Sequence, residues 1–245
     1  MLFRLDQQNR QIQKQLEDLK NAESARKEFT ANVSHELKTP LMSISGYAEL
    51  MMNGMVPQDK MQDFSGRIYH ESERLSNLVA DIIQLSRLDE KNGETMFEPV
   101  DLGELGEDVI NNLQNRAAKK KIRLEYAGAP AQIQGVRHVL YEMFYNLTDN
   151  AIRYTSEGGE VKVFVGKLNG KSYFRVEDNG IGIPENEQQR IFERFYRVDK
   201  SHSRETGGTG LGLSIVKHGA ALHYAKILLD SEPGRGTKME ILFKN

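Results

Sequence analysis

The sequence contains no cysteine among its 245 residues. This absence excludes disulfide bonds, thiolate zinc sites, iron–sulfur clusters and cysteine nucleophiles. Tryptophan is also absent and aromatic residues make up only 8% of the chain, which gives no support to a base-stacking surface for nucleic acid. Neither sign of charge dominates, because 33 basic residues stand against 35 acidic ones and leave a net charge of −2. No strong field therefore draws the chain to nucleic acid or to an anionic membrane.

Long hydrophobic runs are missing as well. No stretch of about 18 uncharged apolar residues occurs, so the sequence predicts no segment that crosses a bilayer. Met1 begins a polar segment without the apolar core of a signal peptide. The length allows one large domain or two modest ones. Because the chain reads as helix before about residue 92 and as mixed strands, helices and Gly-rich turns after it, we expect two.

The first part carries apolar residues at heptad-like spacing over residues 1–53 and again up to about residue 90. Asn53 to Pro57 interrupt the pattern as a helix stop and turn. Two long helices with a short connection predict an antiparallel hairpin. A lone hairpin has little against which to bury its stripe, so we expect a dimeric four-helix bundle; a monomer whose hairpin packs on its own second domain is the alternative. The spaced positions are Leu5, Ile12, Leu16 and Leu19, then in a second register Val33, Leu37, Leu41, Ile44, Ala48 and Met51, and in the second helix Met61, Phe64, Ile68, Glu71, Leu75, Leu78, Ile82 and Leu85.

The second part begins after a linker at Lys91, Asn92 and Gly93. Hairpins and interspersed helices favour an α+β two-layer sandwich over a doubly wound parallel sheet. Asn169-Gly170 is a strong hairpin turn signal. The expected helices are 102–118, 136–154 and 210–222, with a short one inside 178–209, and the expected strands are 121–126, 131–134, 160–166, 172–177, 226–230 and 237–243.

A polar motif around His35 lies at the edge of the first seam, because Val33, Leu37 and Leu41 fill the seam itself. His35 and Thr39 are four residues apart and share one helix face. Glu36 is placed to hold one imidazole N–H, which fixes the tautomer and leaves the other nitrogen as a nucleophile. Pro40 cannot donate to the carbonyl of Glu36, so we expect the helix to loosen or bend there.

A second motif lies in the strongest helix of the second part. Glu142, Asn146 and Asn150 follow one another at four-residue spacing and form a polar stripe. Side-chain oxygens on one face suit a hard cation such as Mg²⁺, which also depends on substrate phosphates. Arg153 lies where it can meet a phosphate, and a plain solvated face is the alternative.

Two glycine-rich segments complete the pattern. Asp178 ends a strand and precedes Gly180 and Gly182, so a carboxylate meets backbone that a flat ligand can approach. Residues 207–213 (Gly-Gly-Thr-Gly-Leu-Gly-Leu) precede a helix and can offer N–H groups to phosphate. They match neither a Walker A loop nor a dinucleotide-binding fingerprint. The polar stretch 199–208 has the composition of a mobile lid.

These motifs, in this order, resemble the cytoplasmic core of a two-component sensor histidine kinase over about residues 25–245. Residues 29–41 look like its phosphoacceptor box and 142–154 like its N box. Residues 178–183 and 207–213 look like its two glycine boxes, and 192–197 like its F box. The resemblance implies a helical dimerisation and histidine-phosphotransfer domain followed by a Bergerat-type ATP-binding domain.

The resemblance also implies roles for individual residues. His35 is implied as the phosphorylated residue and Glu36 as its acid–base partner. From its position one helical turn from His35, and from the Glu36-x-x-Thr39 spacing, we expect Thr39 to position a water that dephosphorylates the receiver. Asn146 and Asn150 are implied at Mg²⁺ and the phosphates of ATP, and Asp178 at the adenine amine. The remaining implied nucleotide-binding residues are Arg153, Tyr154, Gly180, Gly182, Ile183, Tyr196, Arg197, Gly208, Thr209, Gly210, Leu211, Gly212 and Thr237.

The sequence departs from the family pattern at two places. Leu222 to Ala225 stand where the family often has a glycine pair, so a left-handed Gly cap is missing and that turn is in doubt. Arg153 stands where lysine is common, which keeps the charge. His70, His138, His202, His218 and His223 show no metal-ligand spacing and are expected to be structural or solvated.

The implied activity is autophosphorylation of His35 by ATP, followed by transfer to an aspartate of a response regulator receiver domain. A Bergerat-type ATPase clamp and a pseudokinase scaffold are the alternatives. We expect a signal helix at 1–24, the dimerisation and phosphotransfer domain at 25–92 and the ATP-binding domain at 93–245. We also expect a homodimer, no nucleic-acid partner, and a longer natural protein whose membrane anchor in the bacterial cell lies outside this cytoplasmic chain.

Overall fold

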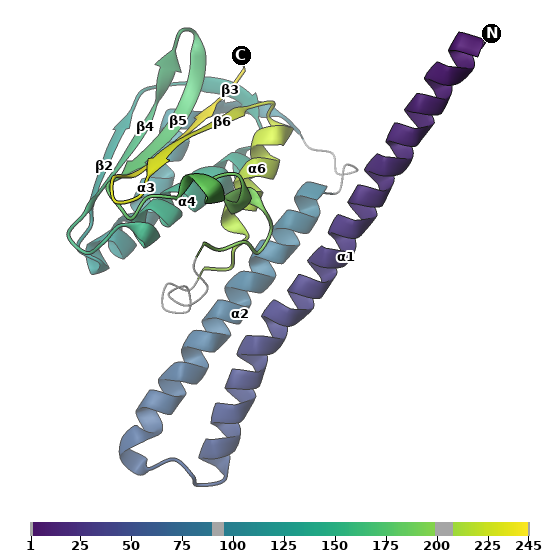
Figure 1. The fold of residues 1–245 in the computed structure, drawn as a ribbon. Coiled ribbons are helices and arrows are strands. Elements are labelled where there is room, and N and C mark those ends of the chain that lie inside the picture. The colour runs from purple at the N-terminus through teal and green to yellow at the C-terminus, as the bar shows by residue number, and fades with distance from the viewer. Residues whose placement is uncertain (1, 90–95, 199–207, 245) are drawn as a thin grey trace. The chain divides into compact units, whose positions relative to one another are not determined.

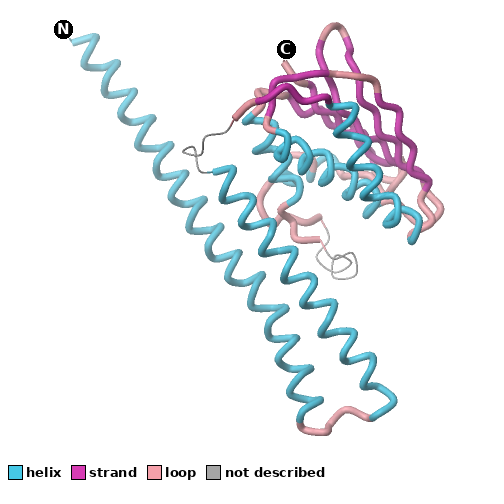
Figure 2. The backbone as a smooth tube through the Cα atoms, turned by 180° about the vertical axis from the view of Figure 1, so that it is seen from behind, coloured by secondary structure: helices cyan, strands magenta, loops and turns pink. Residues whose placement is uncertain are grey.

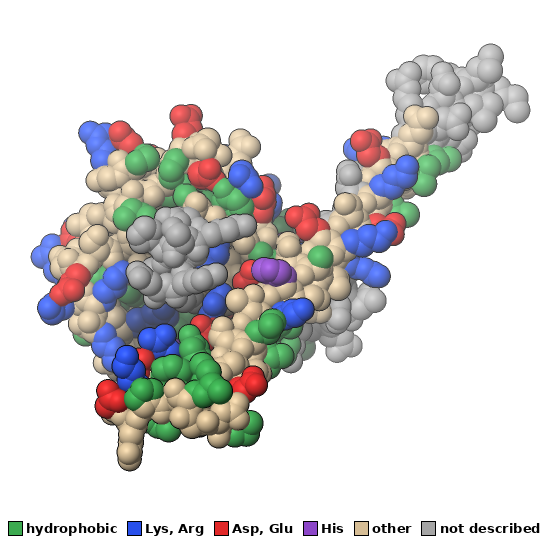
Figure 3. Space-filling view, turned by 60° about the horizontal axis from the view of Figure 1, so that its bottom comes forward, with side chains coloured by type: hydrophobic (Ala, Val, Ile, Leu, Met, Phe, Trp, Pro, Cys, Tyr) green, Lys and Arg blue, Asp and Glu red, His purple; other side chains and the backbone are tan. Residues whose placement is uncertain are grey.

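The computed structural model describes residues 2–89, 96–198 and 208–244. The chain divides into two compact units, Met1–Val79 and Ala80–Asn245. No helix in the described ranges combines the length and the apolar character that a membrane span requires. Side chains of both charges are mixed over the face seen in Figure 3, in keeping with the net charge of −2.

The first unit is a helical hairpin (Figure 2). Helix α1 spans Leu2–Met52 and helix α2 spans Met61–Asp89, with a short 3₁₀ turn η1 at Gln58–Lys60 between them. Gly54 takes a φ of 67° and the N–H of Met55 donates to the carbonyl of Leu50 at 3.0 Å. This left-handed glycine cap ends α1, which confirms the predicted helix stop.

The seam of the hairpin is only partly buried. Along α2 the predicted seam residues are half-buried or buried, and Leu78 is 4% exposed. On α1, Val33, Leu37 and Ile44 are half-buried. Leu41, predicted in the same seam, is instead 54% exposed, because one neighbouring helix covers only one side of α1.

Pro40 does not interrupt α1. The helix is continuous from Leu2 to Met52 with Pro40 inside it. The hydroxyl of Thr39 donates to the carbonyl of His35 at 3.2 Å, and that of Ser43 donates to the carbonyl of Thr39 at the same distance. A proline removes only one backbone N–H, so the helix can continue through Pro40. The loosening or bend expected at this point stays a prediction.

The second unit is a two-layer sandwich of helices on one face of a sheet (Figures 1 and 2), as predicted. The main sheet has five strands in the order β2-β4-β5-β7-β6, and β1 pairs with β3 in a separate two-stranded sheet. Only β2 and β4 pair in parallel. Strand β1 has no apolar alternation and was not predicted. The elements are β1 Glu98–Asp101, α3 Leu102–Lys119, β2 Arg123–Gly128, β3 Gln132–Gly135, α4 Arg137–Tyr154, β4 Glu160–Leu168, β5 Lys171–Asp178, η2 Glu185–Glu187, η3 Arg190–Phe192, α6 Gly212–Leu222, β6 Lys226–Glu232 and β7 Gly236–Leu242.

The sheet has one apolar face and one charged face. Toward the helices, Phe174 of β5 stacks on Phe144 of α4 with ring centroids 3.6 Å apart, and both are fully buried. The opposite face carries one row across all five strands whose charges alternate in sign: Glu125, Lys162, Glu177, Lys238 and Asp230 are register neighbours. A row neutralised in this way is stable in water, so the sheet needs no second layer of helices.

The turn after α6 forms without glycine. Tyr224 takes a φ of 51°, and the N–H of Ala225 donates to the carbonyl of Ala220 at 2.8 Å. This is the Schellman hydrogen-bond pattern, with a tyrosine at the left-handed position where glycine is normal. The turn that the sequence left in doubt therefore closes, at the energetic cost of a strained backbone at Tyr224.

Candidate functional site

His35 lies on the open surface of α1. Its side chain is 79% exposed, and its Nδ1 is 3.8 Å from Oε1 of Glu36. Glu36 is less exposed, at 32%, and its other oxygen is 3.7 Å from Arg74 of α2. Arg74 also approaches Glu71, the acidic member of the α2 seam, at 3.7 Å. The carboxylate of Glu36 is thus held beside Nδ1, while the ring itself is accessible.

Thr39 stands one helical turn beyond His35. Its Oγ1 donates to the main-chain carbonyl of His35 at 3.2 Å. The hydroxyl is therefore directed back along the same face of α1. Thr39 and its neighbour His35 are both solvent-exposed, so a partner molecule can reach the two side chains together.

The polar stripe of α4 contacts the second glycine segment. Asn146 donates from Nδ2 to the carbonyl of Glu142 at 2.9 Å, and a Cβ placed on Gly212 would lie 2.7 Å from its Oδ1. Asn150 is half-buried on the same stripe. Burial raises the pKa of Glu142 from its ordinary value. Among the described residues no group of three or more carboxylates, imidazoles or thiols could hold a metal.

Asp178 ends β5 beside the first glycine segment. Its Oδ1 accepts from the N–H of Gly180 at 2.9 Å and from that of Thr237 at 3.2 Å. Asp178 and Thr237 are also register partners in β5 and β7. Burial raises the pKa of Asp178, although both N–H bonds oppose the rise. Both bonds use Oδ1 and do not occupy Oδ2, which suits an acceptor for an exocyclic amine.

The first glycine segment is packed against backbone. Gly182 has a φ of +68°, and a Cβ there would overlap the carbonyl of Glu232. A Cβ on Gly180 would lie 2.5 Å from the carbonyl of Tyr154, which accepts from Ile181 at 3.2 Å. Ile183 follows, half-buried. A side chain at either glycine would displace this segment from α4 and β6.

Ser231 holds the same segment and was missed from the sequence. Its Oγ accepts from the N–H of Ile183 at 2.8 Å, donates to the carbonyl of Gly236 at 3.0 Å, and lies 2.9 Å from Oγ1 of Thr237. A serine directly after an expected strand carries no signal by itself, because Ile183 lies far away along the chain.

The second glycine segment is described from Gly208 onward; the predicted lid at 199–208 lies otherwise outside the described residues. Gly210 has a φ of +75°, and a Cβ there would lie 2.9 Å from the main chain of Phe195. Leu211 is fully buried, and its N–H donates to Oγ1 of Thr209 at 3.3 Å. Helix α6 begins directly after this loop, at Gly212.

Positive charge gathers beside this loop. A Cβ on Gly208 would lie 3.3 Å from Nη1 of Arg153 and 3.9 Å from Nη2 of Arg197. Tyr196 is engaged elsewhere, because its hydroxyl donates to Glu187 and the guanidinium of Arg190 lies 4.2 Å from its ring. Tyr154, which supplies its carbonyl to the first glycine segment, has a side chain that is 40% exposed.

The second unit therefore joins three groups of predicted residues. Asp178 meets Gly180 and Thr237 at one point. Asn146 meets Gly212 at a second, and Arg153 and Arg197 meet Gly208 at a third. Their chemistry fits the parts of a nucleoside triphosphate: an acceptor for a base amine, amide oxygens for a phosphate-bound cation, and guanidinium groups for phosphates. His35, Glu36 and Thr39 form a separate group in the first unit.

Two family models match the chain. Residues 25–91 match the His Kinase A (phospho-acceptor) domain. Residues 135–245 match the histidine kinase-, DNA gyrase B- and HSP90-like ATPase domain. The first match contains His35 and its neighbours, and the second contains all three residue groups of the sandwich.

Similar proteins carry both parts. A sensor-like histidine kinase SenX3 of Mycolicibacterium smegmatis is 39% identical over 217 residues, which cover 88% of this chain and 56% of the relative. The phosphate regulon sensor protein PhoR of Pseudomonas aeruginosa is 36% identical over 223 residues, covering 88% of this chain and 49% of PhoR. The chain thus spans about half the length of these relatives. The structure of full-length ShkA in complex with AMPPNP has a TM-score of 0.63 and 29% identity, over 87% of this chain and 44% of ShkA.

Proposed function

The chain belongs to the two-component sensor histidine kinases, of which it forms a catalytic core, and we propose on this basis that it phosphorylates His35 with ATP and passes the phosphoryl group to an aspartate of a response regulator. The observation that carries the proposal is the presence in one chain of an accessible His35–Glu36 pair and a sandwich whose buried groups suit ATP.

In this proposal the three residue groups of the sandwich bind ATP. Asp178 accepts from the adenine amine, and Arg153 and Arg197 receive phosphates beside Gly208. Asn146 and Asn150 would hold Mg²⁺, which when bound neutralises phosphate charge during transfer. The AMPPNP named in the ShkA structure supports ATP as the nucleotide.

Phosphoryl transfer uses the two nitrogens of His35 differently. Glu36 holds the proton of Nδ1, so the lone pair of Nε2 is free to attack the γ-phosphorus. The new N–P bond forms as the bond from the γ-phosphorus to the bridging oxygen breaks, and ADP leaves with that electron pair. The positive charge that develops on the ring is offset by Glu36, which can take the Nδ1 proton.

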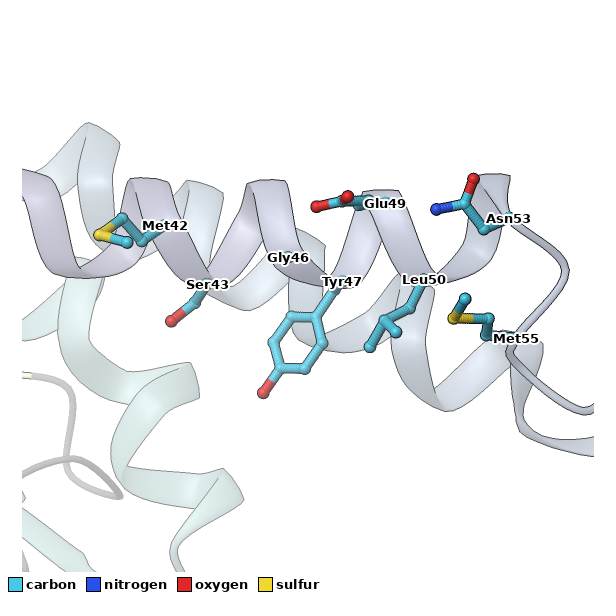
Figure 4. Close-up of a pocket in the computed structure, with 8 residues that line it drawn as sticks. All are labelled: Met42, Ser43, Gly46, Tyr47, Glu49, Leu50, Asn53 and Met55. Carbon is cyan, nitrogen blue, oxygen red and sulfur yellow. The ribbon is translucent and has the colours of Figure 1, made fainter.

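A groove beside His35 suits the receiver domain of the response regulator. Met42 and Gly46 follow His35 at spacings of seven and eleven residues, which place them on its side of α1. They belong to an open groove of about 540 Å³ (Figure 4), where Ser43, Tyr47 and Leu50 project from one side of the helix. A receiver seated here would bring its aspartate toward the phosphohistidine. The groove is lined by Met42, Ser43, Gly46, Tyr47, Glu49, Leu50, Asn53 and Met55.

A different stripe of α1 suits a second copy of the chain. Leu41 is 54% exposed and Met52 is 80% exposed, and Ala48 between them is exposed as well. Spacings of seven and four residues put the three on one side of the helix. A second hairpin would bury this stripe in a four-helix bundle. This chain spans about half the length of its sensor relatives, and we propose that a membrane anchor lies in such additional length.

Radiolabelled ATP tests the kinase proposal. With γ-labelled ATP, we expect acid-labile label on the wild-type chain and a loss of at least about a hundredfold in His35→Gln, because an amide has no nucleophilic nitrogen. His70→Gln, which changes an exposed histidine of α2, is the matched control and should keep the label. Label retained by His35→Gln would refute the assignment. Steady ATP hydrolysis without labelled protein would instead support an ATPase clamp.

Thr39 supports a second, opposing activity. One turn from His35, its hydroxyl can position a water that hydrolyses the aspartyl phosphate of the receiver. Thr39→Ala should then slow dephosphorylation of the receiver while His35 is still labelled. An unchanged rate of receiver dephosphorylation would remove the phosphatase role from the proposal.

A further inference from the structure

Asp149 lies between Asn146 and Asn150 in α4, and the sequence motifs assign it no role. Its side chain is only 10% exposed, and its carboxylate bridges two guanidinium groups. Nη1 of Arg116 in α3 is 2.6 Å from Oδ1, and Nη2 of Arg153 is 3.0 Å from Oδ2. A buried carboxylate without such partners would be strongly destabilising, so the bridge is a constraint on all three side chains.

The ion pair with Asp149 orients the guanidinium of Arg153. One nitrogen of its guanidinium, Nη2, is bound to Asp149, while Nη1 lies 3.3 Å from the Cβ position of Gly208. The Arg153 side chain is 12% exposed, so few other orientations are open to it. Nη2 of Arg197 is 3.9 Å from the same Cβ position, so two guanidinium groups converge on Gly208, and phosphate is a ligand that such groups bind well.

Lys120, the residue that follows α3, also contacts the end of α4. Lys120 donates from Nζ to the carbonyl of Ile152 at 3.0 Å and to that of Arg153 at 2.5 Å. Burial lowers the pKa of Lys120, and the nearby charges of Arg153 and Arg116 lower it further. The last turn of α4 is therefore fixed twice, through its main chain by Lys120 and through its side chains by Arg116 and Asp149.

We propose that Asp149 is a positioning residue for nucleotide binding: held by Arg116, it directs the guanidinium of Arg153 toward Gly208, where the phosphates of ATP are received. The inference rests on the proposed function, since it takes ATP as the ligand. An arginine that is ordered before phosphate binds loses less side-chain entropy when it does bind. Arg116 neutralises the charge of Asp149, while Arg153 donates hydrogen bonds from part of its guanidinium group to the phosphate.

Calorimetric titration with two ligands tests the role. Asp149→Asn keeps the size of the side chain but weakens the ionic bond, and we expect the affinity for Mg·AMPPNP to fall about tenfold. The affinity for adenosine should not change, because adenosine has no phosphate and its base is read by Asp178. A merely structural defect would weaken both ligands alike, and that outcome would overturn the inference.

Two further variants keep the result decisive. Arg116→Gln, at a side chain 45% exposed, should weaken Mg·AMPPNP in the same direction by a smaller factor, and it decides the question if Asp149→Asn does not fold. In an Arg153→Met background, Asp149→Asn should cause no further loss, since its target is gone. Unchanged Mg·AMPPNP affinity in Asp149→Asn and Arg116→Gln, or additive losses in the double variant, would overturn the inference. A wild-type chain that binds neither ligand would overturn the proposed function with it.

Discussion

His35 in the hairpin and His223 in the sandwich show how differently one residue type is used in the two units. The side chain of His35 is 79% exposed, and its Nδ1 lies 3.8 Å from Oε1 of the adjacent Glu36. His223 is 6% exposed and is held by distant parts of the chain. Its Nε2 accepts from the N–H of Val136, 87 residues away, at 3.0 Å, and its Nδ1 lies 2.7 Å from the carbonyl of Gly219. Because Nε2 accepts, Nδ1 carries the proton and the ring is neutral.

The comparison separates reactivity from stability. A histidine that meets phosphate and a partner protein, as proposed for His35, gains from exposure, and one adjacent carboxylate is enough to fix its tautomer. A histidine that joins α6 to the start of α4 gains from burial, which makes each of its hydrogen bonds matter more. The hairpin thus exposes its candidate reactive histidine on a helix with little buried surface, whereas the sandwich holds its candidate site residues with a packed core.

The largest effect on stability is expected when the aromatic stack of the sandwich is removed. Phe174→Ala should cost about 3–5 kcal/mol, because the side chain is fully buried on Phe144 and leaves a cavity. Hydrogen exchange should show faster exchange in β4, β5 and α4 with protection in α1 unchanged. Phe164→Ala, on the charged face of the sheet where Arg175 lies 4.6 Å from the ring, is the control and should cost much less. Equal losses in α1 would show that the two units do not unfold separately.

A smaller effect should follow from pH. Burial lowers the pKa of His223 from its ordinary value of 6.5, and the charge of His138 lowers it slightly further. The unfolded chain therefore binds a proton at higher pH than the native one, so this contribution to stability is complete above about pH 6.5 and declines as the pH falls below it. Urea unfolding of the sandwich between pH 8 and pH 5 should show that decline.

His223→Gln supplies the control for the pH prediction. Glutamine can still accept from the N–H of Val136, but it does not titrate. The variant should be less stable than the wild type at pH 8 and should lose less stability on acidification. Parallel pH profiles for the two proteins would contradict the assignment to His223.

The smallest effect on stability is expected at Tyr224, the residue after His223. Tyr224→Gly should stabilise the sandwich by about 1 kcal/mol, because glycine adopts the observed φ of 51° without strain. The tyrosine side chain is 76% exposed, so little packing is lost. Tyr224→Ala, which keeps a Cβ, should give no comparable gain in urea unfolding. A gain of equal size in both variants would trace the effect to the lost ring and not to the backbone.

Local pattern was enough to predict much of the fold. Heptad spacing predicted α1 and α2, Asn53-Gly54 predicted the turn between them, and Asn169-Gly170 predicted the β4–β5 hairpin. Strand β1 was missed because a four-residue edge segment with a proline has no alternation to detect. Leu41, expected in the seam of a dimeric bundle, is exposed in the single hairpin, since a lone helix pair covers only one side of each helix; its burial therefore stays a prediction about the dimer.

The candidate site divides along the same line. His35, Asn146, Asp178 and the glycines follow from residue type and spacing, because a motif places its chemistry within one or two turns of chain. The four-residue spacing of Asp149 and Arg153 is a readable ion-pair signal, but the third member of their bridge, Arg116, comes from α3. Ser231 likewise acts only because β6 runs beside the first glycine segment.

The helices, the turns and the proposed reactive groups could be predicted from the sequence, since these depend on neighbours along the chain. The fold was needed to show which histidine is buried, which carboxylate pairs with two arginines and which arginine faces the glycine loop. Those properties arise from desolvation and from charges brought together across long separations, and no local spacing encodes them.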